Sequence, residues 1–435
     1  LKDSDNQEIY NKIINLKIEN PFIFLWHIYF APVFDDGGFD IVIGNPPYIQ
    51  LQKATGVKVL DKKGKQIDQK LGDIYAEEKF ESLERTGDIY CLFYEKGFSL
   101  LKEHGTLCYI TSNKWMRAGY GESLRNYFAT KTNPLKLLDL SGAKIFDNAT
   151  VDVNILLSEK AENQGNTQAC SLTEKTGVNN LSHYLNQNQS ECPFTTKDSW
   201  VILSKIEQSI KQKIEAIGTP LKDWNIQINY GIKTGCNEAF IISTEKRNEI
   251  LNNCSSEDER TRTEEIIRPI LRGRDIKRYG YDWDNKWLIA TFPSRHYDID
   301  LYPALKSYLL KFGKEKLEQS GKKYQINGVL VKSRKKTNNQ WFETQDSIAY
   351  WDLFFQPKIC WKAVGRRLAF ALVEEGIYLT APASFISGDS NNEILLAYLC
   401  SAVANYYINQ YSDSTGAGDL MLNIQSLVKL PIPQQ

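Results

Sequence analysis

The first 160 residues show apolar runs typical of strands, separated by patterns typical of helices. Residues 39–44 (Phe-Asp-Ile-Val-Ile-Gly) follow a glycine pair, and a short apolar run of this kind predicts a parallel central strand that is buried on both faces. A helical pattern over 89–101 leads into a second strand at 106–110, and further strands are predicted at 135–140 and 151–157. Strands that alternate with helices predict an α/β sheet.

The rest of the chain is predicted to form a second domain of mixed α+β structure. Residues 161–190 contain ten Asn or Gln and few large apolar side chains. We therefore expect a partial α/β domain over 1–160, a polar linker over 161–203 and a second domain over 204–435. The second domain is predicted to begin with an amphipathic helix over 204–217, which carries four isoleucines on one stripe.

Composition narrows the classes of function without identifying one. The 435 residues are 42% hydrophobic and 24% charged with a formal net charge of zero, which excludes a disordered or collagenous chain. The longest apolar stretch, near residues 22–32, is too short to cross a bilayer, so we expect no membrane contact. Four isolated histidines and eight widely spaced cysteines give no metal motif, and we predict no metal site. Residue 1 is a leucine without a targeting segment after it, so we expect a cytoplasmic protein whose reading frame is longer.

Four residues directly after the first strand carry the most informative chemistry: Asn45, Pro46, Pro47 and Tyr48. Ligands of open α/β sheets bind beyond the carboxyl ends of the strands. An amine conjugated with a heteroaromatic ring is a poor nucleophile, and two acceptors aimed at its hydrogens return the lone pair to nitrogen. The Asn45 side-chain oxygen and the Pro46 carbonyl can be these acceptors, and Tyr48 can stack on the ring. Alternatively, the four residues form only a proline-stiffened turn between a strand and a loop.

The segment "GFDIVIGNPPYIQ" at 38–50 resembles the catalytic motif of the adenine-specific DNA methyltransferases, and the segments at 87–115 and 144–157 resemble later motifs of that family. The resemblance implies the C-terminal part of a Rossmann-like methyltransferase sheet. It also implies methyl transfer from S-adenosylmethionine to the exocyclic amine of a flipped adenine. The residues that the resemblance implies are the catalytic Asn45, Pro46, Pro47, Tyr48 and Phe146 and the cofactor-binding Asp88 and Tyr90. Phe146 can instead be a core residue, and Asp88 can instead be a helix N-cap.

The C-terminal half resembles the TaqI-like specificity domain of the type IIG restriction-modification methylases, through "GIKTGCNEAF" at 231–240, "RPILRGRDIKRYG" at 268–280 and the closing "LLAYLCSAVANYYI" and "LPIPQ". Residues 262–336 hold 18 Lys or Arg and 9 Asp or Glu, a net charge of +9, which is typical of a surface that contacts phosphates. Double-stranded DNA is therefore the expected partner, although each single residue can instead be an ordinary surface charge. The candidate contacts are Lys233, Arg272, Arg274, Lys277, Arg278, Arg366 and Arg367.

Residues 1–36 contain neither the glycine-bearing loop nor the acidic residue with which this family binds S-adenosylmethionine. We therefore expect the main cofactor motif upstream of residue 1, in a missing N-terminal methyltransferase part with or without a nuclease domain, and expect this chain to be inactive alone. Two alternatives stay open. A protein glutamine methyltransferase also uses this tetrad, because an amide nitrogen poses the same lone-pair problem. A DNA-binding specificity protein without catalysis is the other.

Overall fold

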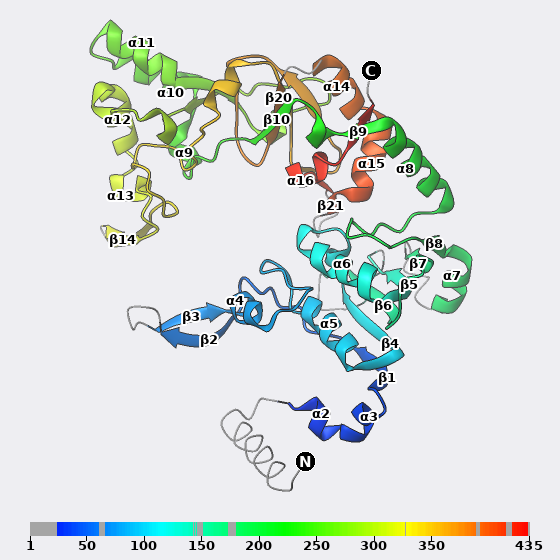
Figure 1. The fold of residues 1–435 in the computed structure, drawn as a ribbon. Helices are drawn as coiled ribbons and strands as arrows, with labels where there is room; N and C mark the ends of the chain where they lie inside the picture. Colours follow the sequence, from blue (N-terminus) through cyan, green and yellow to red (C-terminus); the bar gives the residue numbers. More distant parts are fainter. Residues whose placement is uncertain are drawn as a thin grey trace. The chain divides into compact units, whose positions relative to one another are not determined.

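The computed structural model describes residues 24–60, 66–141, 143, 145, 151–172, 180–326, 328–388, 392–414 and 420–433 (Figure 1). The chain divides into two compact units, Leu1–Glu207 and Gln208–Gln435, which we describe separately as unit 1 and unit 2. Phe146 lies outside the described residues.

Unit 1 is built on one mixed sheet with the strand order β1-β4-β6-β5-β7-β8. The pairs β1/β4 and β5/β7 are parallel, whereas β6 runs antiparallel to both of its neighbours and β8 runs antiparallel to β7. The three strands β1, β4 and β5 consequently point in the same direction. The strands are β1 (Phe39–Gly44), β4 (Leu101–Ser112), β5 (Asn133–Asp139), β6 (Val153–Glu159), β7 (Thr167–Ser171) and β8 (Ser190–Cys192).

An aromatic core joins this sheet to its helices. Trp115 is fully buried, and its ring lies 5.1 Å from that of Phe128 and 5.4 Å from that of Trp200. Tyr94 on α5 packs edge-on against Phe128 on α6, with ring centroids 5.0 Å apart. The helices of unit 1 are α2 (Trp26–Tyr29), α3 (Ala31–Asp35), α4 (Leu71–Tyr75), α5 (Tyr90–Leu100), α6 (Glu122–Lys131) and α7 (Leu181–Asn188), and a hairpin of β2 (Thr55–Leu60) and β3 (Gln66–Lys70) projects from it (Figure 1).

The expected strands are present, but β1 is not the central, doubly buried strand that its apolar run predicts. Among the described residues β1 pairs only with β4, so it is an edge strand. Alternate side chains of a strand point to opposite faces, and a register shift between Phe39 and Ile41 interrupts this alternation. Phe39 and Val42 therefore both pack on the aromatic core, whereas Ile41 and Ile43 are 66% and 78% exposed. The run of apolar residues therefore reflects a second face that no described element covers.

The Asn- and Gln-rich segment 161–203 is not a linker. It contributes β7, α7 and β8 to the sheet of unit 1, because strand pairing depends on backbone groups that any residue except proline supplies. The boundary between the units falls after Glu207, inside the predicted helix, which is observed as α8 (Lys205–Ile217). Two isoleucines of its predicted stripe are exposed, since Ile206 and Ile217 are 74% and 70% accessible. Ile214, by contrast, packs on a core of unit 2.

Unit 2 contains two four-stranded sheets and two large cores, as expected for a mixed α+β domain. One sheet has the order β10-β20-β16-β18 and is wholly antiparallel; the other has the order β11-β13-β12-β19, with a parallel pair at β12/β19. These strands are β10 (Ile226–Tyr230), β11 (Ile241–Ser243), β12 (Ile267–Leu271), β13 (Lys286–Ile289), β16 (Lys358–Trp361), β18 (Phe370–Val373), β19 (Tyr378–Leu379) and β20 (Ser384–Gly388).

Short hairpins and helices complete unit 2. The strands outside the two sheets are β9 (Gly218–Pro220), β14 (Lys323–Ile326), β15 (Val329–Lys332), β17 (Val364–Gly365), β21 (Asp413–Ser414), β22 (Leu420–Met421) and β23 (Pro431–Pro433). The helices after α8 are α9 (Asn237–Phe240), α10 (Thr244–Asn252), α11 (Glu257–Ile266), α12 (Pro303–Leu310), α13 (Lys314–Leu317), α14 (Asn392–Leu399), α15 (Ala402–Tyr411) and α16 (Ile424–Leu427).

One buried arginine holds several loops of unit 2 together. The Arg334 side chain donates from Nε to a carbonyl at 2.7 Å, from Nη1 to two carbonyls at 2.8 Å and from Nη2 to a fourth at 2.7 Å. It is only 5% exposed, and burial lowers its pKa to about 10, so it remains charged at neutral pH. The four carbonyls belong to Leu317, Thr234, Glu343 and Trp341.

Replacing Arg334 with methionine is expected to destabilise unit 2 by about 3 kcal/mol, because four buried carbonyls lose their donors. The exposed neighbour Lys335 provides the control, and Lys335→Met is expected to change the free energy of unfolding by less than about 0.5 kcal/mol. Urea unfolding of both variants measures the difference. Equal stability of the two would show that the four loops hold their positions without the guanidinium.

Candidate active site

The carboxyl ends of three parallel strands bring polar side chains to one edge of the unit 1 sheet. Asn45 follows β1, Asn113 follows β4, and Asp139 ends β5. The Asn113 Nδ2 donates to Asp139 Oδ1 at 2.9 Å, which ties the ends of two strands together. This edge is where ligands of open α/β sheets bind, so it is the candidate active site.

The tetrad begins where β1 ends. The Tyr48 hydroxyl donates to the Asn45 Oδ1 at 3.3 Å, which brings the first and last side chains of the tetrad together. Asn45 is exposed and Tyr48 is half-buried, whereas Pro46 is buried. Burial raises the pKa of Tyr48, so its hydroxyl is protonated and remains a donor at neutral pH. No hydrogen bond within the described residues ends on the Pro46 carbonyl.

The structure brings Asp88 and Tyr90 beside the tetrad. Ile89 donates its backbone N–H to the Ile49 carbonyl at 2.9 Å, and the residues on either side pair as well. The Tyr48 and Tyr90 rings meet edge-on with centroids 6.0 Å apart, and Tyr90 is fully buried. Its hydroxyl lies 2.8 Å from that of Tyr120. Sequence motifs separated by some forty residues thus form one wall.

Asp88 is a nearly buried carboxylate rather than a helix cap. The N-cap of α5 is Ile89, and no side chain bonds there. Asp88 is 9% exposed, and burial raises the pKa of its carboxyl group, while the charges of Lys114 and Lys53 oppose that shift. No hydrogen bond to the carboxylate exists among the described residues. It is available to a polar group of a ligand.

Several residues of this edge were not among the sequence candidates. Asn113, Lys114, Asp139 and Tyr120 are the main ones. Polar residues at the ends of two strands were a signal for Asn113 and Asp139, whereas no strand end marks Tyr120. Beneath them, the buried Asn154 accepts hydrogen bonds from the Thr111 hydroxyl at 2.9 Å and the Trp115 indole at 3.3 Å. These hydrogen bonds join β4, β6 and the aromatic core.

The candidate DNA contacts of unit 2 divide into two groups. Arg272 is engaged within the protein: its Nε and Nη2 donate to Asp275 at 3.0 and 2.9 Å, and Nη2 also pairs with Asp284. Arg278 donates to the Cys400 carbonyl at 2.8 Å, yet it lies in an exposed loop. The others are exposed: Lys233, Arg274, Lys277, Arg366 and Arg367.

Strand pairing places several of these residues near one another. Ile232 bonds to one side of β19 and the segment after it, and Leu271 bonds to the other side. Lys233 and Arg272 therefore directly follow the two segments that flank β19. Gly273 packs against Lys362, where an added Cβ would lie 3.5 Å from the lysine Cβ. The loop 272–278 consequently lies beside the connection between β16 and β18, which carries the paired arginines at 366–367.

Comparison with known protein families gives one match within unit 1 and another within unit 2. Residues 1–146 match the Eco57I restriction-modification methylase family, and residues 268–432 match the TaqI-like C-terminal specificity domain. Both parts of the chain are thus similar to restriction-modification methylases. Among its relatives, the type II methyltransferase M.BstVI of Geobacillus stearothermophilus is 22% identical over 422 residues, which cover 91% of this chain and 67% of the relative. The type II restriction enzyme and methyltransferase RM.Eco57I of Escherichia coli is 28% identical over 207 residues, 47% of this chain and 19% of the relative.

A solved structure has the same fold. The type IIL restriction-modification enzyme MmeI, determined in complex with DNA, aligns with 90% of this chain at a TM-score of 0.51 and 11% identity. This chain spans 46% of MmeI and about two thirds of M.BstVI. In the described ranges, no helix has the length and apolar character needed to span a bilayer, and no cluster of three His, Cys, Asp or Glu is arranged around a common point.

Replacing Asp88 with asparagine is expected to change how the stability of unit 1 depends on pH. Because the folded pKa of Asp88 is raised above 3.8, the native state binds more protons than the unfolded state, and this group destabilises unit 1 as the pH rises through its titration. Asp88→Asn is expected to remove this loss of stability with rising pH. Hydrogen exchange of the backbone amides in α5, corrected for intrinsic rates, measures the stability at each pH.

A second carboxylate provides a control of opposite sign. The hydrogen bond and charge of Lys102 lower the pKa of the exposed Asp40, so its contribution is present above pH 3.8 and lost as the pH falls. Asp40→Asn should therefore remove a gain of stability with rising pH. The assignment of Asp88 fails if both variants shift the pH dependence in the same direction.

Proposed function

We propose that the enzyme formed by this chain methylates the exocyclic amine of adenine in DNA, with S-adenosylmethionine as the methyl donor. The observation that carries the proposal is the tetrad at the carboxyl end of β1, where the Asn45 Oδ1 and the Tyr48 hydroxyl lie 3.3 Å apart at an exposed position. The match to the methylase family supports methyl transfer to DNA, and the tetrad supports an amine as the acceptor.

The chemistry follows from the acceptors that the tetrad offers. The Asn45 Oδ1 and the Pro46 carbonyl accept the two hydrogens of the adenine amine, which favours pyramidal nitrogen and restores its lone pair. The hydrogen bond from Tyr48 to Asn45 is long, so the substrate amine can replace it. The Tyr48 ring, supported edge-on by Tyr90, stacks on an extruded base, and Phe146 is proposed as the second aromatic face.

The residues present fit one side of S-adenosylmethionine. Asp88 is a nearly buried carboxylate without a hydrogen-bond partner among the described residues, so a hydroxyl or ammonium group of a ligand would satisfy it. Tyr90, beside it, provides a fixed aromatic wall. We therefore propose Asp88 and Tyr90 as residues that hold the cofactor. S-adenosylmethionine supplies an electrophilic methyl group, which needs no acidic general base from the chain.

Unit 2 is proposed to select the DNA site. The exposed basic residues Lys233, Arg274, Lys277, Arg366 and Arg367 are suited to phosphates, and Arg278 joins them from its loop. Arg272 is proposed to act first as a brace, because its guanidinium is already bonded to Asp275. A nuclease partner domain is a further proposal, which the double name of RM.Eco57I supports. A cytoplasmic location is proposed with it, because both relatives named above come from bacteria, in which DNA lies in the cytoplasm.

In the complete enzyme, Asn45→Ala is expected to lower the rate of methyl transfer by more than about 100-fold, because one of the two acceptors for the amine is lost. DNA affinity should stay within a few fold. Asn126→Ala, an exposed asparagine on α6, is the matched control and should retain full activity. Methylation of duplex DNA from radiolabelled S-adenosylmethionine measures both variants. Transfer to protein glutamine instead of DNA would contradict the proposal, as would retained activity of Asn45→Ala.

The paired substitution of Arg274 and Lys277 by alanine is expected to weaken DNA binding and to reduce the slope of log affinity against log salt by about one unit per lost phosphate contact. Both side chains are exposed, so their removal should leave the fold intact. Lys213→Ala on α8 serves as the control for loss of surface charge. An unchanged slope in the double variant would move the DNA surface away from the loop 272–278.

A further inference from the structure

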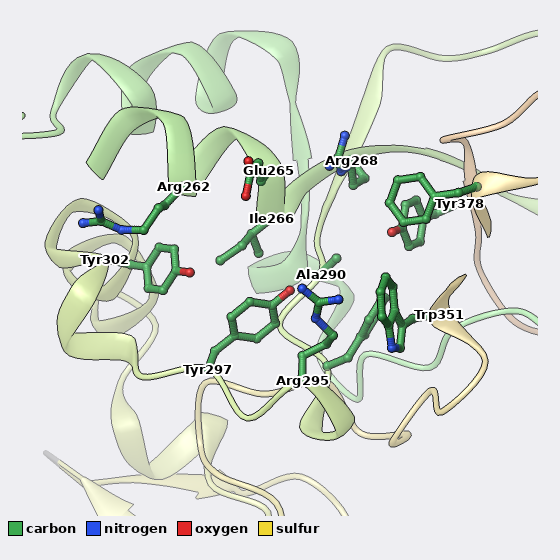
Figure 2. A pocket seen from close by; sticks show the side chains of 12 residues that line it. Arg262, Glu265, Ile266, Arg268, Ala290, Arg295, Tyr297, Tyr302, Trp351 and Tyr378 are labelled. Carbon is green, nitrogen blue, oxygen red and sulfur yellow. The ribbon is translucent and has the colours of Figure 1, made fainter. Parts of the chain in front are cut away.

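A cavity of about 210 Å³ lies in unit 2, lined by α11, by β12 and β19, and by the segments around Tyr297 and Trp351 (Figure 2). Its walls combine three arginines with several aromatic rings. None of the candidate DNA contacts lines it. The cavity belongs to unit 2, whereas the Asn45 tetrad belongs to unit 1.

The side chains that line this pocket carry a net positive charge. Arg262, Arg268 and Arg295 line it, against Glu265 as the one acidic lining residue. None of the three arginines forms an ion pair with another described residue, unlike the nearby Arg247, which pairs with Glu264. The Nε groups of Arg262 and Arg268 are buried and have no hydrogen-bond partner in the described part of the chain. Buried charged donors of this kind favour an anionic ligand.

Aromatic contacts hold the guanidinium groups in place. Arg295 stacks on the indole of Trp351, 3.9 Å from its centroid, with Tyr297 on its other side at 5.9 Å (Figure 2). Arg268 lies 5.4 Å from the ring of Phe355. A guanidinium that is stacked on a ring keeps its in-plane N–H groups free, and these match two oxygens of a phosphate.

The remaining walls suit a planar ring. Tyr378 is held by a parallel stack on Phe354, with centroids 4.5 Å apart, and Tyr297 and Tyr302 meet edge-on at 6.1 Å. Burial raises the pKa of Tyr297 and of Tyr302, so both hydroxyls are protonated donors at neutral pH. The pocket thus offers hydroxyl donors and apolar faces next to positive charge.

We propose that this pocket binds an unpaired nucleotide, with its base among the aromatic rings and its phosphate on the arginines. The cavity of about 210 Å³ is on the scale of a single base rather than of a base pair with its two backbones. Aromatic faces beside arginines are the usual features of sites for unpaired bases. The source is either a nucleotide displaced from a DNA strand or a free mononucleotide, which present the same chemistry.

Calorimetric titration of the full chain with deoxyadenosine 5′-monophosphate, deoxyadenosine and inorganic phosphate tests the proposal. The nucleotide should bind at least tenfold more tightly than either part alone. Arg295→Ala should weaken nucleotide binding at least about tenfold, and Arg295→Lys should also weaken it, because lysine keeps the charge but loses the planar fork. Lys314→Ala, which removes an exposed charge on α13, should leave binding within twofold.

A second experiment identifies the source. Duplexes with and without a one-nucleotide bulge are compared for binding to wild type and to Arg295→Lys. A preference for the bulge that Arg295→Lys abolishes supports a displaced strand nucleotide, and nucleotide binding without this preference supports a free mononucleotide. Phosphate binding as tight as that of the nucleotide, failure of all probes to bind, or nucleotide binding unchanged in a folded Arg295→Lys chain would overturn the proposal. None of these readouts depends on methyl transfer, so they are independent of the Asn45→Ala test.

Discussion

The shared direction of β1, β4 and β5 is the constraint on which the candidate active site depends. Residues that follow parallel strands must leave the sheet at the same edge, and so Asn45, Asn113 and Asp139 meet there although they are far apart in sequence. β6 lies between β4 and β5 and runs antiparallel to both, so β4 and β5 run in the same direction. The pairing of residues 49–51 with 87–89 then brings the second wall to the tetrad.

Local patterns predicted most of the elements and the tetrad. The strands at 39–44 and 135–140 and the helix at 89–101 are confirmed to within a few residues, because each depends on its own apolar spacing. Partners that come from elsewhere in the chain could not be predicted in this way. The exposed Ile41 and Ile43 look in sequence like any buried residue, and the polar segment 161–203 pairs into the sheet through its backbone.

Arginine has three different roles in unit 2, and sequence alone does not separate them. Arg334 is buried and bonded to four carbonyls, and Arg272 braces a loop through Asp275. Arg295 lies stacked on Trp351 in a pocket and forms no ion pair with another described residue. All three fall within the same basic stretch, whose net charge of +9 indicated a phosphate surface. The charge of a segment therefore overstates what is available to a ligand, because part of it is already neutralised or buried.

The hydrogen bond between Tyr48 and Asn45 has a consequence for selectivity. In the proposed reaction, the substrate amine and the Tyr48 hydroxyl donate to the same Asn45 oxygen. At 3.3 Å the internal hydrogen bond is weak, so its replacement costs little. An amine that supplies one donor would gain little over the tyrosine. A ring amine would gain more, because it would also reach the Pro46 carbonyl and stack on the Tyr48 ring. Under this proposal, the contact between Tyr48 and Asn45 favours amines that are attached to a planar ring.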